Sequence, residues 1–411
     1  MVENLLYQCP VVVDLTDPMQ LDQIINKANY LLASGIEPHE LNSLEYRLIS
    51  EMEDVSPMAS VAVKLARSKR IVESISEPTT VSIVFAVYKE HNRIRTKEEH
   101  PHGEDFLVRK SSQLNWLFQG SNVSWNMIVV DDGCPERSGQ IAQEIIEKND
   151  LSDHVNVLFL QDAIDQKLPV VRGLSTPDDS RKGGSITYGM WHAARKCNFN
   201  NHVIVYTDAD LSTHLGQLGL MLHPIINKGK NVAIGSRRES DSVVMKSSSR
   251  NDRGKLFIYL WKRLVPELDY IIDTQCGFKA FKCETVNNII DDLIERKFAF
   301  DIELLLKSEL LKEHSIDKVG IAWIDSEAAS TTTDLQPYHS MLQAIAAMYR
   351  KYLPTNPESD SFATFIEELS ENEFQQLLMQ IPTGITDREP MDYAEYNDVL
   401  PDDLREAIGI N

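Results

Sequence analysis

An unbroken apolar run from Val203 to Tyr206 constrains the fold of this chain more than any other stretch. A strand that is apolar on both faces is typical of the centre of a parallel sheet covered by helices on both sides. Two carboxylates spaced one residue apart, Asp208 and Asp210, follow almost at once. Like charges at the end of a buried strand repel one another and lose hydration, so they favour a position where a cation neutralises them. The stretch therefore predicts a central strand with a charged tip.

This tip has two interpretations. Carboxylate oxygens are hard ligands suited to Mg²⁺ or Mn²⁺, which keep waters and take further ligands from substrate phosphates. Open α/β sheets also bind ligands in the crevice beyond the carboxyl ends of their strands. Alternatively, Asp208 only ends the strand and Asp210 caps the next helix, whose apolar pattern starts near Leu215.

Three helices are predicted before the sheet begins. Between Leu21 and Ile75 the apolar residues recur at helical spacing, and Pro38 and Pro57 interrupt the pattern. We expect residues 1–77 to form a helical N-terminal extension that packs on the main domain or on a partner.

From residue 78 onward strands and helices alternate, which predicts an α/β fold with a mostly parallel sheet. The polar stretch 161–184 shows no clear periodicity and is expected to be a binding loop or a lid. The alternation breaks after residue 235, and we expect this domain to span 78–353. The expected strands cover 81–87, 127–130, 155–160, 203–206, 232–234 and 319–324, and the expected helices cover 106–118, 140–147, 183–197, 215–226, 255–264, 283–294, 301–311 and 338–352.

The last segment, 354–411, is strongly acidic. Residues 355–411 hold 14 Asp and Glu against two Arg, so a net −12 of the total charge of −21 falls there. Helical apolar spacing at Phe362, Phe365 and Ile366 favours docked helices, whereas the charge would also suit a disordered arm. The overall charge argues against nucleic acid as a partner.

The composition, with 42% hydrophobic and 25% charged residues, is that of a soluble globular protein. No apolar window is long enough for a membrane span, and the N-terminus lacks a basic region followed by an apolar core, so we expect a cytoplasmic protein. The five cysteines form no Cys-x-x-Cys pair, which suggests neither a zinc site nor a disulfide framework.

Polar groups follow three of the predicted strands, and they should meet at one edge of the sheet: residues 88–92, Asp131 with Asp132, and the pair described above. Asp131 or Asp132 could accept hydrogen bonds from a base or ribose, or could simply cap a helix beside Gly133. Lys182 and Gly183 at a helix start could place a cation and free N–H groups near a phosphate, although such pairs are also common in loops.

These motifs together resemble a known family. Residues 81–87, 129–133 (Val-Val-Asp-Asp-Gly), 182–184 (Lys-Gly-Gly) and 206–212 (Tyr-Thr-Asp-Ala-Asp-Leu-Ser) are similar to the nucleotide-binding half of the family 2 glycosyltransferases of GT-A fold. Residues 235–237, 273–279 (Asp-Thr-Gln-Cys-Gly-Phe-Lys) and 298–303 (Phe-Ala-Phe-Asp-Ile-Glu), with Trp323 followed by Ser326 and Glu327, resemble the dolichyl-phosphate β-glucosyltransferase branch. The resemblance covers about residues 81–352.

The resemblance implies a Rossmann-like GT-A domain that binds a UDP-sugar, most readily UDP-glucose. It places Asp131 or Asp132 near the uridine, and Asp208 and Asp210 on a Mg²⁺ or Mn²⁺ ion that bridges the two phosphates. Such a cation stabilises the charge that develops on the leaving diphosphate. Lys182 and Gly183 would lie beside these phosphates.

The acceptor side is implied by the same resemblance. Arg237, with Arg250 or Arg253, matches the region that faces the acceptor phosphate in that branch, although it could also be a solvated loop. Asp301 and Glu303 lie at a helix start, where capping competes with sugar binding or catalysis. An ionised phosphate acceptor needs no strong base, whereas a hydroxyl acceptor would make one of these two carboxylates the candidate base.

The chain departs from that branch because no N-terminal membrane anchor is expected. The acceptor therefore stays open between another lipid phosphate, reached by peripheral contact with a membrane, and a small phosphorylated or hydroxylic molecule. Our principal hypothesis is a metal-dependent, inverting glycosyltransferase. The alternatives are a nucleotidyltransferase, disfavoured because residues 88–92 contain no glycine, and a non-catalytic nucleotide-sugar-binding protein, disfavoured by the intact carboxylate pairs.

Overall fold

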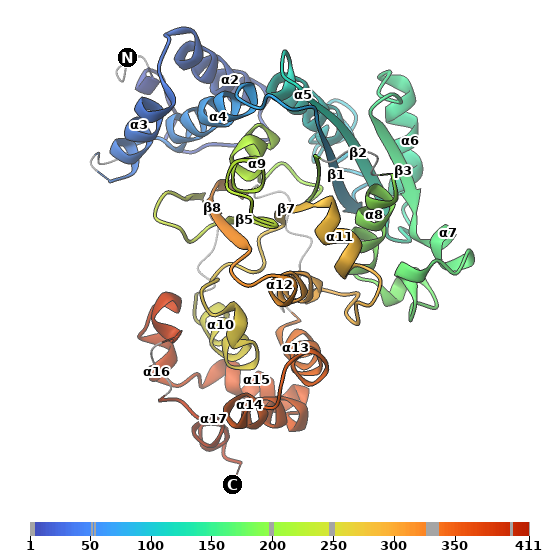
Figure 1. Cartoon of the computed structure of the whole chain (residues 1–411), viewed down its shortest axis with the longest axis vertical. Coiled ribbons are helices and arrows are strands. Elements are labelled where there is room, and N and C mark those ends of the chain that lie inside the picture. Colours follow the sequence, from blue (N-terminus) through green and yellow to red (C-terminus); the bar gives the residue numbers. More distant parts are fainter. Residues whose placement is uncertain are drawn as a thin grey trace.

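A seven-stranded mixed sheet forms the centre of the molecule (Figure 1), with the strand order β3-β2-β1-β4-β7-β5-β8. The structure is a computed structural model that describes residues 5–50, 52, 55–196, 201–245, 251–325, 337–394 and 398–410. The strands are β1 (Thr79–Val87), β2 (Val123–Asp131), β3 (Val155–Phe159), β4 (His202–Thr207), β5 (Val232–Ser236), β7 (Phe278–Lys282) and β8 (Ile316–Gly320).

The carboxyl ends of β2, β1 and β4 lie side by side. β1 pairs in parallel with both neighbours, and Val87 at its end is in register with Asp131 at the end of β2. The prediction that residues 88–92, Asp131–Asp132 and Asp208–Asp210 follow adjacent strand ends is therefore confirmed. β7 is antiparallel to both β4 and β5, which makes the sheet mixed.

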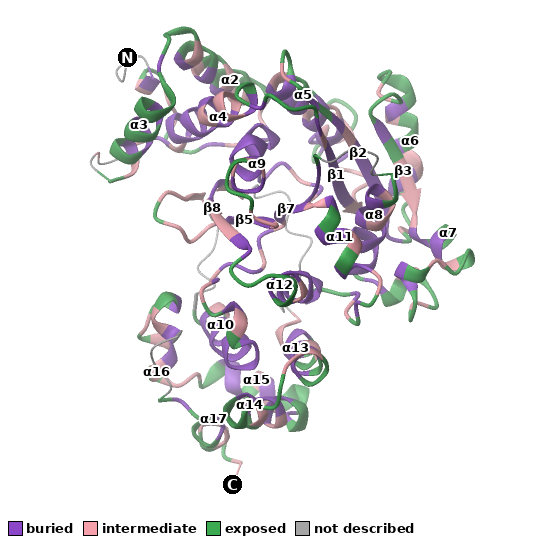
Figure 2. Cartoon of the chain, in the orientation of Figure 1, coloured by how far each residue is buried: buried purple, intermediate pink, exposed green. Residues whose placement is uncertain are grey.

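Helices cover both faces of the sheet, as expected for an α/β fold. Successive side chains of β1 point to opposite faces, and Ile83 and Val84 accordingly belong to two separate hydrophobic clusters. Both clusters are purple in Figure 2. One face packs on α4 (Pro57–Glu73), α5 (Phe106–Phe118), α6 (Ser138–Lys148), η3 (Leu215–Gln217) and α9 (Leu218–Asn227), and the other on α8 (Gly183–Arg195), α10 (Asn251–Leu264), η4 (Pro266–Leu268), α11 (Cys283–Ile289) and α12 (Phe300–Leu311).

The N-terminal extension contains the three expected helices, α2 (Pro18–Ala33), α3 (Pro38–Ser50) and α4. Asp17 and Ser56 cap α2 and α4, and a proline follows each cap, which is the usual start signal of a helix. α4 is the link to the sheet, because the buried Lys64 ammonium donates to the carbonyl of Gly320, at 2.8 Å, and pairs with Glu45, at 2.7 Å. The extension thus packs on the main domain.

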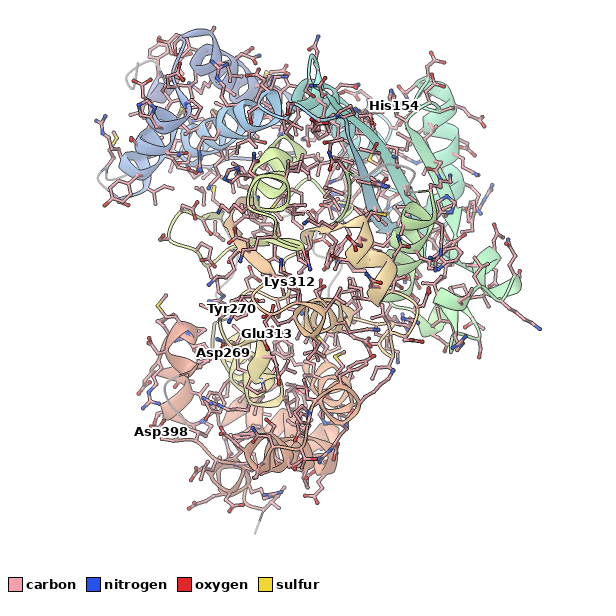
Figure 3. The ribbon with its side chains drawn as sticks, viewed as in Figure 1. His154, Asp269, Tyr270, Lys312, Glu313 and Asp398 are labelled. Atoms are coloured by element: carbon pink, nitrogen blue, oxygen red, sulfur yellow. The ribbon has the colours of Figure 1, made fainter. Side chains whose placement is uncertain are left out.

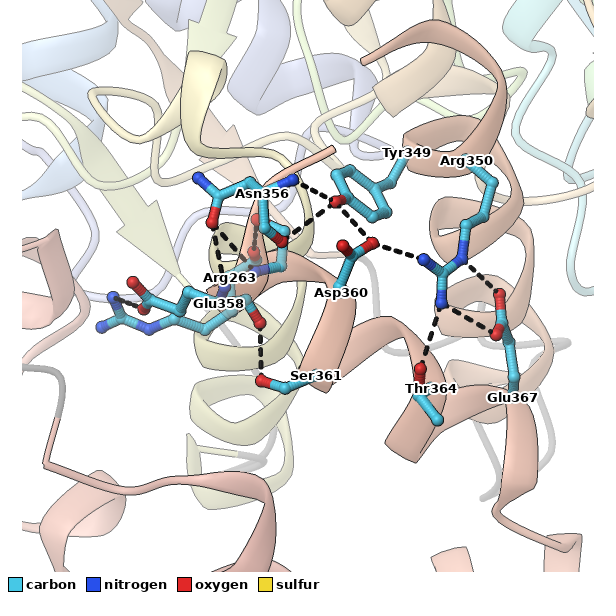
Figure 4. A network of polar contacts seen from close by, with 10 residues as sticks. Arg263, Tyr349, Arg350, Asn356, Glu358, Asp360, Ser361, Thr364 and Glu367 are labelled. Carbon is cyan, nitrogen blue, oxygen red and sulfur yellow. Dashed lines mark hydrogen bonds and ion pairs between the residues drawn. The ribbon is translucent and has the colours of Figure 1, made fainter. Parts of the chain in front are cut away.

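The acidic segment forms helices that pack on the main domain. Phe362, Phe365 and Phe374 are buried in the same cluster as α10 and α12. Figure 4 shows one of its polar contacts: the guanidinium of Arg350 reaches Asp360, at 2.5 Å, and Glu367, at 3.2 Å. The helices of this segment are α14 (Pro357–Glu368), α15 (Glu371–Met379), α16 (Thr383–Thr386), η6 (Pro390–Ala394) and α17 (Pro401–Ala407), and α14 packs on α13 (Tyr338–Tyr352).

The turns that follow α10 and α12 meet between the sheet and these C-terminal helices. Figure 3 labels Asp269 and Tyr270 on the first turn beside Lys312 and Glu313 on the second. The Tyr270 hydroxyl donates to the Glu309 carboxylate at 2.8 Å, so the first turn is bonded to α12.

Several local expectations need correction. Stretch 161–184 is not without structure, since it holds the end of α7 (Leu160–Asp165) and two turns started by prolines, η1 (Pro169–Val171) and η2 (Pro177–Asp179). α11 stops at Ile289 rather than 294. The strand expected over 319–324 is split into β8 and β9 (Ala322–Ile324), and β9 pairs with β6 (Val243–Met245) in a second sheet. β7 was not anticipated.

Among the described residues, no helix has both the length and the apolar character needed to cross a membrane.

Candidate active site

Asp208 and Asp210 lie on the turn directly after β4, the fourth strand in the sheet order. The backbone N–H of Asp208 donates to the carbonyl of Gly277 at 3.1 Å, and a Cβ atom at Gly277 would lie 2.3 Å from the Asp208 carboxylate. Asp210 accepts the N–H of Ser212 at 3.0 Å. The two side chains stay 36% and 24% exposed, so both carboxylates still reach solvent from a turn that backbone hydrogen bonds hold.

Three cationic side chains surround this turn. The Lys182 ammonium contacts the Asp208 carboxylate, the Arg93 guanidinium lies 3.7 Å from Asp210, and the fully buried Lys110 adds its field. Burial acts to raise the pKa of Asp208, but Lys182, Lys110 and Arg237 together hold it below its ordinary value. Positive charge therefore keeps Asp208 ionised.

Lys182 reaches the turn from a distorted loop. Arg181 and Lys182 both have positive backbone φ angles, 66° and 87°, which residues other than glycine rarely adopt. Asp132 holds this conformation, because its carboxylate accepts the Lys182 N–H at 2.8 Å and the Ser185 hydroxyl at 2.6 Å. The predicted uridine ligand Asp132 is thus tied to the predicted phosphate-binding loop.

Gly183 and Gly184 seat the start of α8 against the loop before α12. A Cβ atom at Gly183 would lie 2.4 Å from the carbonyl oxygen of Lys297, so only glycine fits this approach. The N–H of Gly184 is not free for a phosphate here, since it donates to the carbonyl of Arg296 at 2.8 Å.

Arg237, one residue after β5, forms a bidentate pair with the buried Asp273. Its Nε and Nη2 lie 2.8 Å and 2.7 Å from the two carboxylate oxygens, and its guanidinium stacks 5.4 Å above the ring of Trp323. Despite burial, this guanidinium lowers the pKa of Asp273 to about 2. Because Arg237 also lowers the pKa of Asp208, it belongs to the same site.

Asp301 lies beneath the turn, at the start of α12. Its carboxylate accepts from the Lys279 ammonium, at 2.8 Å, and from the Tyr206 hydroxyl. Burial raises the pKa of Asp301 to about 8 and lowers that of Lys279 to about 7. Lys182 opposes the rise at Asp301, so its charge acts on both Asp301 and Asp208.

A protein-family model matches part of the sequence. Residues 112–286, which include both carboxylate pairs and the Lys182 loop, match the model of the family described as Glycosyl transferase family 2. Residues 112–286 are therefore a family 2 glycosyltransferase domain. The predicted enzyme class is confirmed.

Relatives of this glycosyltransferase support the predicted branch. It is 26% identical over 271 residues to a dolichyl-phosphate beta-glucosyltransferase of Dictyostelium discoideum, covering 64% of this chain and 71% of the relative. It is 29% identical over 230 residues to the human protein of the same name, covering 54% of this chain and 61% of the relative. Among solved structures, glucosyl-3-phosphoglycerate synthase from Mycobacterium tuberculosis, in complex with Mn²⁺ and UDP-glucose, matches with a TM-score of 0.46 and 15% identity, covering 71% of this chain and 84% of that one.

Two predicted site residues of the glycosyltransferase are bonded to its own backbone. The Asp131 carboxylate accepts the N–H groups of Gly133, Cys134 and Gly139 at 2.7 to 2.9 Å, so it does cap the turn beside Gly133. The buried Glu303 accepts the N–H of Ile294, at 2.7 Å, and is not directed at Asp208 by any contact in the described part of the chain.

Of the two further arginines in the predicted acceptor region, Arg250 lies outside the described residues, as do Ser326 and Glu327, while Arg253 is exposed on α10.

The residues present fit a divalent cation that shares its shell with a substrate. Two solvent-facing carboxylates two residues apart supply hard oxygen ligands, and no cluster of three or more His, Cys, Asp or Glu side chains forms among the described residues. Mg²⁺ and Mn²⁺ commonly bind in this way, through few protein ligands plus phosphates and waters. Lys182 and Arg93 contribute positive charge beside the pair.

Sequence reasoning missed Arg93 and Lys279. Arg93 bonds to Glu104, at 3.0 Å, and to Glu90, at 3.1 Å, as well as approaching Asp210. The polar loop after β1 was the available signal for Arg93, but the predicted polar stretch ended at residue 92.

Proposed function

We propose that this glycosyltransferase moves a sugar, most readily glucose, from a UDP-sugar to a phosphate or hydroxyl acceptor, with inversion at the anomeric carbon. The observation that carries the proposal is the Asp208–Asp210 turn at the end of β4, ringed by Lys182, Arg93 and Arg237. Such a set of charges suits a metal–diphosphate complex, which needs carboxylates for the cation and cations for the phosphate oxygens. The dolichyl-phosphate glucosyltransferase relatives support glucose as the sugar.

In this proposal Asp208 and Asp210 hold a Mg²⁺ or Mn²⁺ ion, which neutralises charge on the departing diphosphate. Lys182 moves its contact from Asp208 to a phosphate oxygen of the donor, where it acts as a fixed positive charge as negative charge develops. Arg237 faces the acceptor phosphate with the Nη1 edge that Asp273 does not occupy.

The transfer itself is a single displacement. The acceptor oxygen forms a bond to the anomeric carbon on the face opposite the diphosphate, the bond from that carbon to the diphosphate oxygen breaks, and UDP leaves with the electron pair. A phosphate acceptor brings an ionised oxygen and needs no base. For a hydroxyl acceptor we propose the ionised form of Asp301 as the proton acceptor: with a pKa of about 8 this form is the minor one at neutral pH, but it is a stronger base than an ordinary carboxylate.

Glu303 and Asp132 take positioning roles in this proposal. Glu303 accepts the N–H groups of Ile294 and Glu295 and the hydroxyl of Tyr352, which fixes the loop before α12. Asp132 fixes the conformation of Lys182. Either residue can still face a ligand once the donor is bound, and we keep Asp131 and Asp132 as the proposed neighbours of the uridine.

The test is UDP release from UDP-glucose with Mn²⁺, measured over a panel of lipid-phosphate, sugar-phosphate and hydroxylic acceptors. We expect release that stops on chelation and in Asp210→Asn, while the matched variant Asp153→Asn, at an exposed loop position, keeps full activity. A chain that binds UDP-glucose tightly but releases no UDP with any acceptor would contradict the proposal, as would full activity in Asp210→Asn.

A further inference from the structure

The N-terminal helix α4 reaches the part of the molecule that holds Arg237. The Lys64 ammonium on α4 is fully buried and lies 3.7 Å from the carboxylate of Asp241, in the turn after β5. The same ammonium donates to the carbonyl of Gly320, at the end of β8, at 2.8 Å. Arg237 starts the turn that contains Asp241, and Trp323, on which Arg237 stacks, follows Gly320 by three residues. Lys64 therefore contacts both the segment that carries Arg237 and the segment that carries its stacking partner.

Hydrogen bonds close the turn between Arg237 and Asp241. The Ser242 hydroxyl donates to the carbonyl of Ser236 at 2.8 Å, and the Ser236 hydroxyl donates to the Glu239 carboxylate at 3.0 Å. The backbone N–H of Ser242 donates to the carbonyl of Glu239, also at 3.0 Å. Because these bonds join the two ends of the turn, a displacement of Asp241 is passed on to Arg237.

A close approach to Gly320 fixes the position of Asp241. A Cβ atom at Gly320 would lie 1.9 Å from Oδ1 of Asp241, so only glycine leaves room for this carboxylate. Gly320 is in register with Ser236 where β8 pairs with β5, and the N–H of Ile321 donates to the carbonyl of Ser236 at 3.2 Å. The end of β8 and the turn that carries Arg237 are thus bonded to each other.

The buried ammonium of Lys64 already has a carboxylate partner within the N-terminal extension. Glu45 on α3 lies 2.7 Å from Lys64 and also contacts Arg67, and its side chain is only 3% exposed. The side chain of Asp241, in contrast, is 46% exposed. The charge of Lys64 is therefore balanced inside the extension without Asp241, and the additional contact acts mainly on the turn that carries Arg237.

We propose that Lys64 is a positioning residue for Arg237, which makes the N-terminal extension part of the acceptor side of the enzyme. Lys64 attracts the Asp241 carboxylate and holds the carbonyl of Gly320, and together these contacts fix the turn that carries Arg237 beside Trp323. A guanidinium binds a phosphate most strongly when its orientation is fixed in advance. The link to the acceptor rests on the proposed function, whereas the positioning of Arg237 does not.

Steady-state kinetics of UDP release test this role, with the acceptor from the panel above that gives the fastest release. We expect Asp241→Asn to raise the KM for that acceptor about two- to thirtyfold, while the KM for UDP-glucose and the affinity for UDP with Mn²⁺ stay unchanged. Gly320→Ala should have the same effect, because its methyl group displaces the Asp241 carboxylate without removing a charge. Asp317→Asn removes a carboxylate of β8 that pairs with Lys228, and it should change neither KM.

A variant of the lysine itself completes this test. Lys64→Met, alone or combined with Asp241→Asn, should show about the same KM for the acceptor as Asp241→Asn, because all three lose the same contact. If Lys64→Met loses its native circular dichroism, Asp241→Asn and Gly320→Ala decide. An unchanged KM for the acceptor in both of these would overturn the role of Lys64, as would an equal loss of kcat with both KM values unchanged, which is the result of a smaller folded fraction.

Acrylamide quenching of Trp323 fluorescence tests the positioning without any acceptor. The signal of Trp323 is the difference between each protein and the same protein with Trp323→Phe. We expect quenching to increase in Asp241→Asn and Gly320→Ala, because the Arg237 guanidinium then covers the indole less. Unchanged quenching in both variants would overturn the positioning. Increased quenching in a chain that releases no UDP with any acceptor would keep the positioning and remove the proposed function.

Discussion

At the scale of single residues, Gly277 determines how Asp208 is held. A methyl group there would lie 2.3 Å from the Asp208 carboxylate, so Gly277→Ala must displace that side chain. We predict that Gly277→Ala lowers the affinity for UDP with Mn²⁺ at least about tenfold, a loss of about 1.4 kcal/mol. Calorimetric titration measures this. Gly254→Ala is the matched control, because nothing lies within 4 Å of its added methyl group, and it should bind normally.

The buried His214 should make the free energy of unfolding depend on pH. It is buried, its Nδ1 accepts the N–H of Gly216 at 2.9 Å, and burial with the nearby Lys110 lowers its pKa from 6.5 to about 3. Below pH 6.5 the unfolded chain therefore takes up a proton at this residue that the folded chain refuses, so stability falls as the pH falls. At pH 5 the loss is about 2 kcal/mol.

Urea unfolding at pH 7 and pH 5 checks this value by comparing the unchanged chain with His214→Asn. The unchanged chain should lose about 2 kcal/mol more than the variant between the two pH values. Parallel losses in both proteins would show that His214 is protonated in the folded chain.

The sequence could reveal Asp208 and Asp210 because their signal is local, a buried strand followed at once by charge. Arg93 and Lys279 could not be found in this way, since their partners Glu104 and Asp301 are 11 and 22 residues away. Asp131 shows the converse limit. A carboxylate after a strand is equally typical of a turn cap and of a ligand-binding group, and here it accepts three backbone N–H groups.

At the scale of elements, β7 depends on one buried pair. Lys279 is fully buried in this central strand and bonds to Asp301 on α12. We predict that Lys279→Met destabilises the fold by about 3 kcal/mol, because it leaves Asp301 buried without its donor. Denaturant unfolding measures the loss. Lys282→Met, on the same strand but partly exposed, should cost far less, and the double variant Lys279→Met with Asp301→Leu should recover most of the stability. An equal cost for Lys279→Met and Lys282→Met would contradict this role.

The same pair explains why β7 was missed. The sequence Phe-Lys-Ala-Phe-Lys lacks the two-residue alternation of a half-buried strand, because its lysines are three residues apart, and Lys279 is buried in the core. The buried Lys279 ammonium is stabilised by Asp301 on α12. A local sequence pattern cannot predict a contact with a residue of another element. Helices with long periodic faces, such as α5 and α13, were predicted with the bounds that the structure has.

At the scale of the whole molecule, the C-terminal helices are part of the folded body. Phe365 is 2% exposed in the cluster that also contains α10 and α12. We predict that Phe365→Ala lowers the free energy of unfolding by about 3 to 5 kcal/mol and that the chain still melts in one calorimetric transition. Met379→Ala, at a position that is 76% exposed, should change stability by less than about 0.5 kcal/mol. A separate early transition in Phe365→Ala would show instead that these helices unfold independently.

The acidic charge of residues 354–411 follows from the composition. Their packing on the main domain could be predicted only from the few apolar residues that recur at helical spacing. Those positions decided between a docked helix and an arm, because Phe362, Phe365 and Phe374 all entered the core.

The central claim is that Asp208 and Asp210 hold a cation that binds a diphosphate, and the most direct measurement is calorimetric titration of the chain with UDP, with and without Mn²⁺. We predict tight binding only with Mn²⁺, lost in Asp208→Asn and Asp210→Asn and kept in Asp153→Asn. Equal affinity for UDP with and without Mn²⁺, or in all four proteins, would contradict the account.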